Sequence, residues 1–136
     1  MKSRYVIFAD DDADDLELIT GFFKHYNRNI NVLEFKDGKE VIKFLDDFAS
    51  QSSTPLLIVL DINMPHPNGK EILVAVRNHP KYQYVPVVIY TNSTSKSDED
   101  FCRHLGASWV NKSTSIESVK QIAKVLAEFC DLQNVH

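Results

Sequence analysis

The stretch PLLIVLDINMPHPNG, residues 55–69, decides the fold of this chain, because an apolar run and a sharp turn follow one another in it. The apolar run, residues 56–60, lacks the alternation of a strand that faces water on one side. Such a run is typical of a central strand in a parallel sheet covered by helices on both faces. It stops at Asp61, and turn residues follow at once. We therefore expect Asp61 at the carboxyl end of a buried strand, where open α/β sheets bind ligands.

Length and composition are those of an ordinary globular protein. The chain has 136 residues, 43% of them hydrophobic and 25% charged, and we predict a single domain over 1–136 with its core at about 5–130. No apolar run approaches the ~18 residues of a membrane helix, so we expect no membrane span and a cytoplasmic location. Cys102 and Cys130 lack metal-ligand spacing and are expected to be reduced. The net charge of −4 offers no general attraction to nucleic acid.

Short apolar segments are predicted to form five strands, over residues 5–9, 30–35, 56–60, 87–90 and 107–111. Four of these strands end in polar side chains. The first is followed by Asp10 and Asp11, the third by Asp61, the fourth by Thr91 and the fifth by Lys112. Because the carboxyl ends of parallel strands lie at one edge of a sheet, these side chains are expected to gather there.

Helices are predicted between the strands and after the last one. Apolar residues recur at helical spacing in five segments: Leu16, Ile19, Phe22, Phe23 and Tyr26; Val41, Phe44, Leu45 and Phe48; Ile72, Leu73 and Val76; Phe101, Cys102 and Leu105; and Val119, Ile122, Ala123, Leu126 and Phe129. Asp14 and Asp15 would occupy the first helical turn, where the helix dipole favours negative charge. Alternating strands and helices predict an α/β fold, a doubly wound five-stranded parallel sheet with five helices on its two faces.

Three carboxylates at one edge of a sheet repel one another. A like-charge pair at ~4 Å costs on the order of 4 kcal/mol at an effective dielectric constant near 20. A proton or a cation must therefore sit among them, and carboxylate oxygens favour Mg²⁺, with Mn²⁺ or Ca²⁺ as substitutes. With Lys112 as a positive charge and Thr91 as a hydroxyl donor, the edge becomes an acceptor site for a phosphoryl group.

Four motifs in this order resemble those of a two-component response-regulator receiver domain of the stand-alone chemotaxis-regulator type. They are FADDD, LDINMPHPNG, VVIYTN and GASWVNK, and the resemblance runs from about residue 5 to residue 129. It implies a flavodoxin-like fold with strand order 2-1-3-4-5. It also implies a signalling domain that catalyses only its own phosphorylation and dephosphorylation, not an enzyme acting on a separate substrate.

The resemblance implies a role for each acidic residue. Asp61 would be the phosphorylated nucleophile. Asp11 would bind Mg²⁺ directly and Asp10 mainly through water, and the main-chain carbonyl of Asn63 would complete the protein's share of the metal shell. Phosphate would come from a histidine of a sensor kinase or phosphotransfer protein.

Three further residues would link phosphorylation to an output. Thr91 and Lys112 would each bind a phosphoryl oxygen, and Trp109 would be the aromatic switch residue that turns inward. The fourth helix, fifth strand and fifth helix, roughly 95–105 and 109–120, would then present an altered face to a protein partner.

Three departures from the family pattern bear on this site. Ser113 follows Lys112 where the family usually has a cis proline. Because a cis bond without proline costs roughly 3 kcal/mol or more, we expect either a trans bond with a shifted loop or a strained cis bond. Asn92 is larger than the usual residue after the switch threonine and would narrow access. The longer loop at 50–54 would lie away from the site.

Alternative functions remain open at this point. A haloacid-dehalogenase-type phosphatase would use Asp10 as its nucleophile and needs a later acidic pair, which is missing after Lys112. A receiver-like interaction module would never be phosphorylated. A nucleotide-binding protein would want a Gly-rich loop where this chain has DDDADD. A receiver-type transcription factor would need a DNA-binding domain, for which few residues remain after Phe129.

Overall fold

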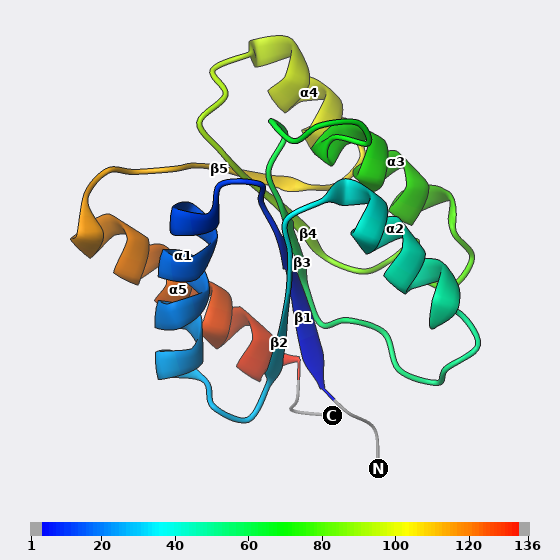
Figure 1. Cartoon of the computed structure of the whole chain (residues 1–136), viewed down its shortest axis with the longest axis horizontal. Coiled ribbons are helices and arrows are strands. Elements are labelled where there is room, and N and C mark those ends of the chain that lie inside the picture. The colour runs from blue at the N-terminus through cyan, green and yellow to red at the C-terminus, as the bar shows by residue number, and fades with distance from the viewer. Residues whose placement is uncertain (1–3, 134–136) are drawn as a thin grey trace.

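The computed structural model describes residues 4–133, so the ends of the predicted domain, 1–3 and 134–136, lie outside the described residues (Figure 1). The strands are β1 (Tyr5–Ala9), β2 (Asn31–Phe35), β3 (Ile58–Leu60), β4 (Val87–Thr91) and β5 (Ser108–Asn111). The helices are α1 (Ala13–Tyr26), α2 (Gly38–Asp47), α3 (Gly69–Asn78), α4 (Lys96–His104) and α5 (Ile116–Leu132). Strands and helices alternate along the chain, as predicted.

The five strands form one parallel sheet in the order β2-β1-β3-β4-β5, which confirms the predicted fold class and strand order. The register pairs Ala9 with Leu60, so Asp10 and Asp61 leave the sheet at the same level. β3 begins at Ile58, two residues later than predicted, although the backbones of Leu56 and Leu57 already hydrogen-bond to β1.

Two apolar layers cover the sheet. In Figure 1, α1 and α5 lie to the left of the sheet, and α2, α3 and α4 lie to its right. The layer under α1 and α5 includes an edge-to-face pair, Phe8 and Phe23, with ring centroids 5.4 Å apart. The other layer includes Cys102 of α4 and Trp109 of β5. Neighbouring side chains of β5 therefore contact different layers: Trp109 lies in the layer with α4, and Val110 packs against the layer under α1 and α5.

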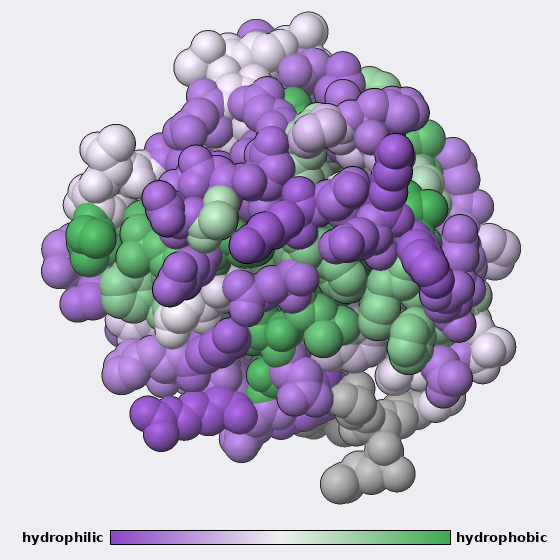
Figure 2. Space-filling model, in the orientation of Figure 1, coloured by the Kyte–Doolittle hydropathy of each residue, from purple (hydrophilic) through white to green (hydrophobic). Residues whose placement is uncertain are grey.

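Four aromatic residues that the sequence analysis placed at helical spacing are exposed: Tyr26, Phe48, Phe101 and Phe129. In α5, Ala127 and Cys130 face the sheet, while Phe129 is 38% exposed. The smaller side chains of Ala127 and Cys130 thus occupy the buried face of α5, and the larger ring of Phe129 lies toward solvent. Figure 2 shows mostly hydrophilic side chains on the face in view, with hydrophobic ones surfacing between them at left, at the centre and at right. No helix within residues 4–133 is long and apolar enough to cross a bilayer.

The pair Asp37-Gly38 is typical of a turn, but the helix that follows β2 already begins at Gly38. Asp37 is the N-cap of α2, and its carboxylate accepts a hydrogen bond from the Lys39 amide. Gly38 is therefore the first helical residue, and a side chain there would overlap the carbonyl oxygen of Pro67. The loop after β3 thus packs directly on the start of α2.

Candidate functional site

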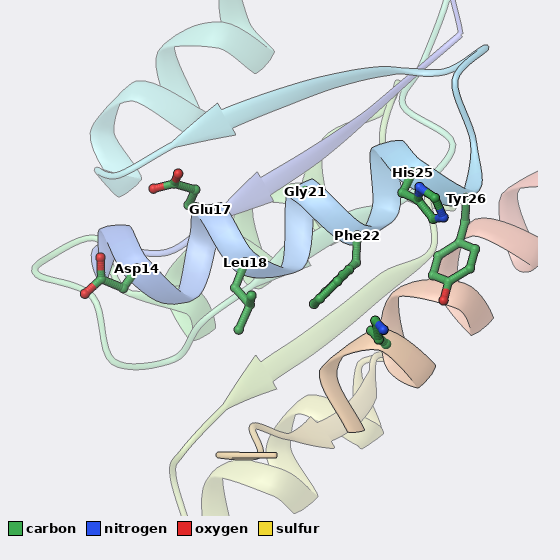
Figure 3. A pocket seen from close by; sticks show the side chains of 8 residues that line it. Asp14, Glu17, Leu18, Gly21, Phe22, His25 and Tyr26 are labelled. Carbon is green, nitrogen blue, oxygen red and sulfur yellow. The ribbon is translucent and has the colours of Figure 1, made fainter. Parts of the chain in front are cut away.

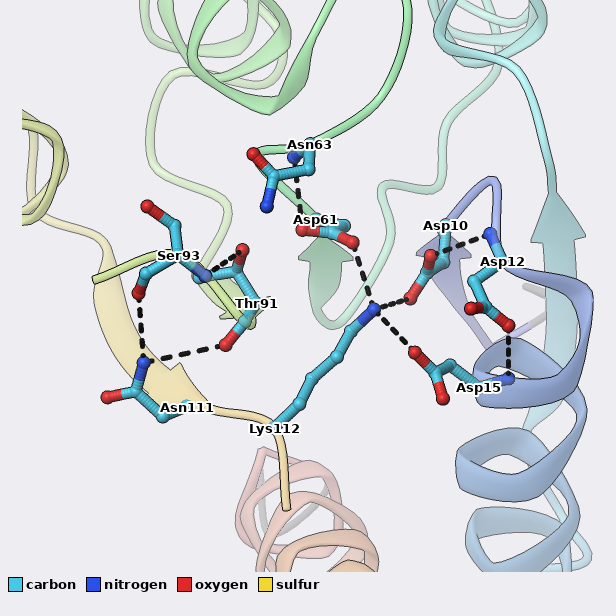
Figure 4. Close-up of polar contacts among 9 residues, drawn as sticks. All are labelled: Asp10, Asp12, Asp15, Asp61, Asn63, Thr91, Ser93, Asn111 and Lys112. Carbon is cyan, nitrogen blue, oxygen red and sulfur yellow. Dashed lines mark hydrogen bonds and ion pairs between the residues drawn. The ribbon is translucent and has the colours of Figure 1, made fainter. Parts of the chain in front are cut away.

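The predicted site residues converge at the carboxyl edge of the sheet (Figure 4). Lys112, which follows β5, places Nζ 2.7 Å from Oδ2 of Asp10 and 2.9 Å from Oδ2 of Asp61. All three side chains are almost fully buried, at 5–6% exposure. The ammonium therefore joins the ends of β1 and β3 to the end of β5.

A third carboxylate in this cluster was missed by the sequence analysis. Asp15 of α1 lies 2.9 Å from Lys112 Nζ through its Oδ2 atom. From sequence, Asp15 was interpreted only as a favourable charge in the first helical turn. A contact between positions 15 and 112 depends on the packing of α1 beside the β5–α5 connection, and no local pattern signals it.

Backbone amides fix the orientation of the two buried carboxylates. Oδ1 of Asp10 accepts a hydrogen bond from the Asp12 amide at 2.9 Å, and Oδ1 of Asp61 accepts one from the Asn63 amide at 3.1 Å. In both residues Oδ2 is the atom that meets Lys112. Asp12 is also the N-cap of α1. Each carboxylate is thus held by its own loop before any ligand arrives.

Burial and charge shift the pKa values at this edge in a consistent way. Burial raises the pKa of Asp10 to about 6, although Lys112 and the Asp12 amide oppose the shift. Burial alone would lower the pKa of Lys112, but its hydrogen bonds to Asp10, Asp15 and Asp61 raise the pKa above its ordinary value. Lys112 is therefore a permanent cation among acids, one of which resists ionisation.

The acidic cluster has the composition of a site for a hard divalent cation. Oxygen atoms of Asp10, Asp11 and Asp61 all lie within 4.8 Å of one another. Mg²⁺ binds oxygen at roughly 2.1 Å, so opposite ligands stand about 4.2 Å apart, and small side-chain rotations would bring these oxygens together. The donor set therefore fits Mg²⁺, Mn²⁺ or Ca²⁺. Asn63 borders the cluster, joined to Asp61 through its amide.

Thr91 lies fully buried at the end of β4, where a network of hydrogen bonds holds it. Its Oγ1 accepts a hydrogen bond from the Ser93 amide at 3.1 Å, and its carbonyl accepts one from the Lys112 amide at 2.8 Å. The Asn111 side chain donates to the Ser93 carbonyl at 3.1 Å. A threonine hydroxyl can also donate one hydrogen bond, in addition to the one that Oγ1 accepts here.

Three other residues of interest lie beside the cluster. Trp109 is 8% exposed and packs within the layer that contains α4. Ser113 follows Lys112 through a trans bond, since the one cis peptide among residues 4–133 is His66-Pro67. Asn92 is exposed. Of the alternatives proposed for Ser113, the structure thus has the trans bond.

A hollow of about 660 Å³ lies elsewhere, between α1 and α5. In Figure 3, Phe22 and Tyr26 project from α1 on the side of α5. Asp14 and Lys120 also border this groove, but none of the converging site residues does.

Comparisons with known proteins agree with this geometry. Residues 6–124 match the family described as the response regulator receiver domain. The chain is 27% identical over 132 residues to chemotaxis protein CheV1 of Helicobacter pylori, covering 96% of this chain and 39% of that protein. It is 26% identical over 97 residues to response regulator Rcp1 of Synechocystis, covering 70% and 66%. The chain thus spans less than two thirds of the length of these two curated relatives.

A solved structure covers nearly the whole chain. The phosphorylated cyanobacterial phytochrome response regulator RcpA superposes with a TM-score of 0.86 at 25% identity, over 99% of this chain and 98% of that one.

Proposed function

This chain belongs to the response regulator receiver domain family, and we propose that it accepts a phosphoryl group on Asp61 from a phosphohistidine of a sensor histidine kinase or phosphotransfer protein. The observation that carries the proposal is the burial of Asp61 against Lys112, with the carboxylates of Asp10 and Asp11 within 4.8 Å. The similar protein RcpA was crystallised in a phosphorylated form, which supports the same chemistry here.

In the proposed reaction, a carboxylate oxygen of Asp61 attacks the phosphorus atom. An O–P bond forms, and the N–P bond to the donor histidine breaks, leaving its electron pair on the imidazole nitrogen, which takes up a proton. Lys112 and the hydroxyl of Thr91 each donate a hydrogen bond to a phosphoryl oxygen as charge builds there. Attack by water on the same phosphorus later releases phosphate and restores the Asp61 carboxylate.

Asp10, Asp11 and Asp61, with the main-chain carbonyl of Asn63, would hold the Mg²⁺ ion. The ion would supply positive charge that offsets repulsion between the acids and the phosphoryl oxygens. Holding Asp61 through the Asn63 amide keeps the nucleophile oriented without help from the donor.

The proposed output passes through Thr91 and Trp109. β4 and β5 are paired, with Ile89 opposite Trp109 and Thr91 opposite Asn111, so a shift of Thr91 toward a phosphoryl group disturbs β5 directly. Trp109 shares an apolar layer with Cys102 of α4. The α4–β5–α5 face, about 95–105 and 109–120, is therefore the surface that would present the change to a protein partner.

Intact-mass analysis after incubation with acetyl phosphate tests the acceptor residue. We expect a phosphoryl mass gain that needs Mg²⁺, persists in Asp100→Asn, a variant of an exposed acid in α4, and disappears in Asp61→Asn. A mass gain retained by Asp61→Asn would overturn the assignment. If the wild type neither gains mass nor binds beryllofluoride with Mg²⁺, an interaction module that is not phosphorylated becomes the better description.

The single tryptophan of the chain reports on the switch. Beryllofluoride with Mg²⁺ should change Trp109 fluorescence in the wild type, and Thr91→Ala should remove most of this change while Thr94→Ala keeps it. An undiminished change in Thr91→Ala would contradict the proposed coupling between the two residues.

A further inference from the structure

All three N–H groups of the Lys112 ammonium have a carboxylate partner. An ammonium group has three donors, and Nζ lies 2.7–2.9 Å from Asp10, Asp15 and Asp61. In Figure 4, Asp15 reaches this atom from α1, and Asp10 and Asp61 reach it from the ends of their strands. The three partners are therefore not equivalent in position.

They are also not equivalent toward a metal ion. Asp10 and Asp61 belong to the group of oxygens that fits a divalent cation, whereas Asp15 does not. A cation bound there competes with Lys112 for the same two carboxylates, and two positive centres at this distance repel each other. The Lys112 side chain is 6% exposed, so water cannot replace the partners that it loses.

We propose that Asp15 is a positioning residue, which keeps the Lys112 ammonium at the sheet edge while a divalent cation occupies Asp10 and Asp61. This inference rests on the proposed function. Asp15 is the partner of Lys112 that neither metal binding nor phosphorylation of Asp61 removes. Its backbone is fixed in the first turn of α1, because its amide donates a hydrogen bond to Oδ1 of the N-cap Asp12 at 3.0 Å. With Asp15 as a remaining partner, the Lys112 ammonium can break its ion pairs with Asp10 and Asp61 and still stay at the sheet edge.

The proposal predicts the effect of replacing Asp15. Without that carboxylate, Lys112 depends on Asp10 and Asp61 alone, and a metal ion must displace it from both. Asp14, the preceding residue, lies in the same first turn and is exposed. Asp14 therefore supplies a matched control, because removing its charge changes the net charge and the interaction with the helix dipole as removing the charge of Asp15 does.

Calorimetric titration with magnesium chloride tests the inference without any kinase. Asp14→Asn should weaken Mg²⁺ binding by no more than about twofold, since exposed charges are screened. Asp15→Asn should weaken it by about tenfold, and Asp15→Glu should restore most of the loss. In a Lys112→Met background, Asp14→Asn and Asp15→Asn should have equal effects, because the coupling needs the ammonium. Circular dichroism checks that each variant is folded.

The outcomes separate the two proposals. Equal losses for Asp14→Asn and Asp15→Asn with Lys112 intact overturn the role of Asp15 and leave the proposed function standing. An undiminished difference between them in the Lys112→Met background also overturns it, because Asp15 would then act without Lys112. A folded wild type that binds no Mg²⁺ overturns the proposed function and this inference with it.

Discussion

The first turn of α3 packs so closely on the site loop that a Cβ atom at Gly69 would stand 2.8 Å from the carbonyl carbon of Asp61. Backbone cannot yield as a flexible side chain does. Gly69→Ala should therefore lower the free energy of unfolding by about 1–3 kcal/mol and slow phosphorylation, because relief of the overlap displaces the residue that carries the nucleophile. Urea unfolding and the rate of mass gain with acetyl phosphate measure the two effects.

Gly21 provides the matched control, since a Cβ there meets nothing within 4 Å. It lies within α1, so Gly21→Ala should stabilise the protein by roughly 0.5–1 kcal/mol and leave phosphorylation unchanged. A Gly69→Ala protein as stable as the wild type would show that the loop adjusts without strain.

Arg77 links α3 to two other segments, the one that precedes β4 and the one that follows α4. Its guanidinium donates to the carbonyl oxygens of Leu105 at 2.6 Å and Val85 at 2.7 Å. Arg77→Met should lower the free energy of unfolding by about 2–3 kcal/mol, because partly buried carbonyls lose charged donors. Arg103→Met, which removes only a surface pair with Glu99, should change it by less than ~1 kcal/mol. Similar losses in both variants would contradict this role for Arg77.

The raised pKa of Asp10 has a consequence for stability that can be measured against pH. Burial raises this pKa from 3.8 to about 6, so folding disfavours the ionised carboxylate. Its ionisation therefore costs stability above about pH 6 and costs none below about pH 4. With EDTA present, Asp10→Asn should be more stable than the wild type by about 1–3 kcal/mol at pH 7.5. Urea unfolding should show this difference shrinking toward pH 4, and a difference independent of pH would exclude the explanation.

The two thiols should be inert in the folded protein. Neither Cys102 nor Cys130 forms a disulfide, and both are buried. Burial raises their pKa values to about 11 and about 12. Because the thiolate is the reactive form, Ellman's reagent should label neither thiol quickly in buffer at pH 8, and both within minutes in urea. Rapid labelling in buffer would reveal an opening of α4 or α5.

Much of the site was predictable because buried parallel strands leave a clear mark in sequence. An apolar run that stops at a polar residue places that residue at the carboxyl edge, and this reasoning located Asp10, Asp61, Thr91 and Lys112 together. Their assigned roles in phosphoryl transfer stay predictions, and so does the single domain over 1–136.

The features that the sequence did not predict depend on packing between segments that are distant along the chain. Asp15 has a sufficient local explanation in the helix dipole, so nothing pointed to its contact with Lys112. Phe129 was misplaced because helical spacing favours large apolar residues for the inner face, whereas Ala127 and Cys130 occupy the inner face of α5. The Asp37-Gly38 pair is typical of a turn, but here the glycine is needed for another reason. A side chain at position 38 would overlap the carbonyl oxygen of Pro67.

The sheet order has a mechanical meaning for this cluster of charges. Asp10 and Asp61 stand at the ends of β1 and β3, which are flanked by neighbours on both sides, whereas Lys112 follows β5, an outermost strand with β4 as its one neighbour. The two acids thus follow strands that are held from both sides, whereas the cation follows a strand that is held from one side only. We therefore expect a rearrangement at Asp61 to be taken up mainly at the β5 edge of the sheet.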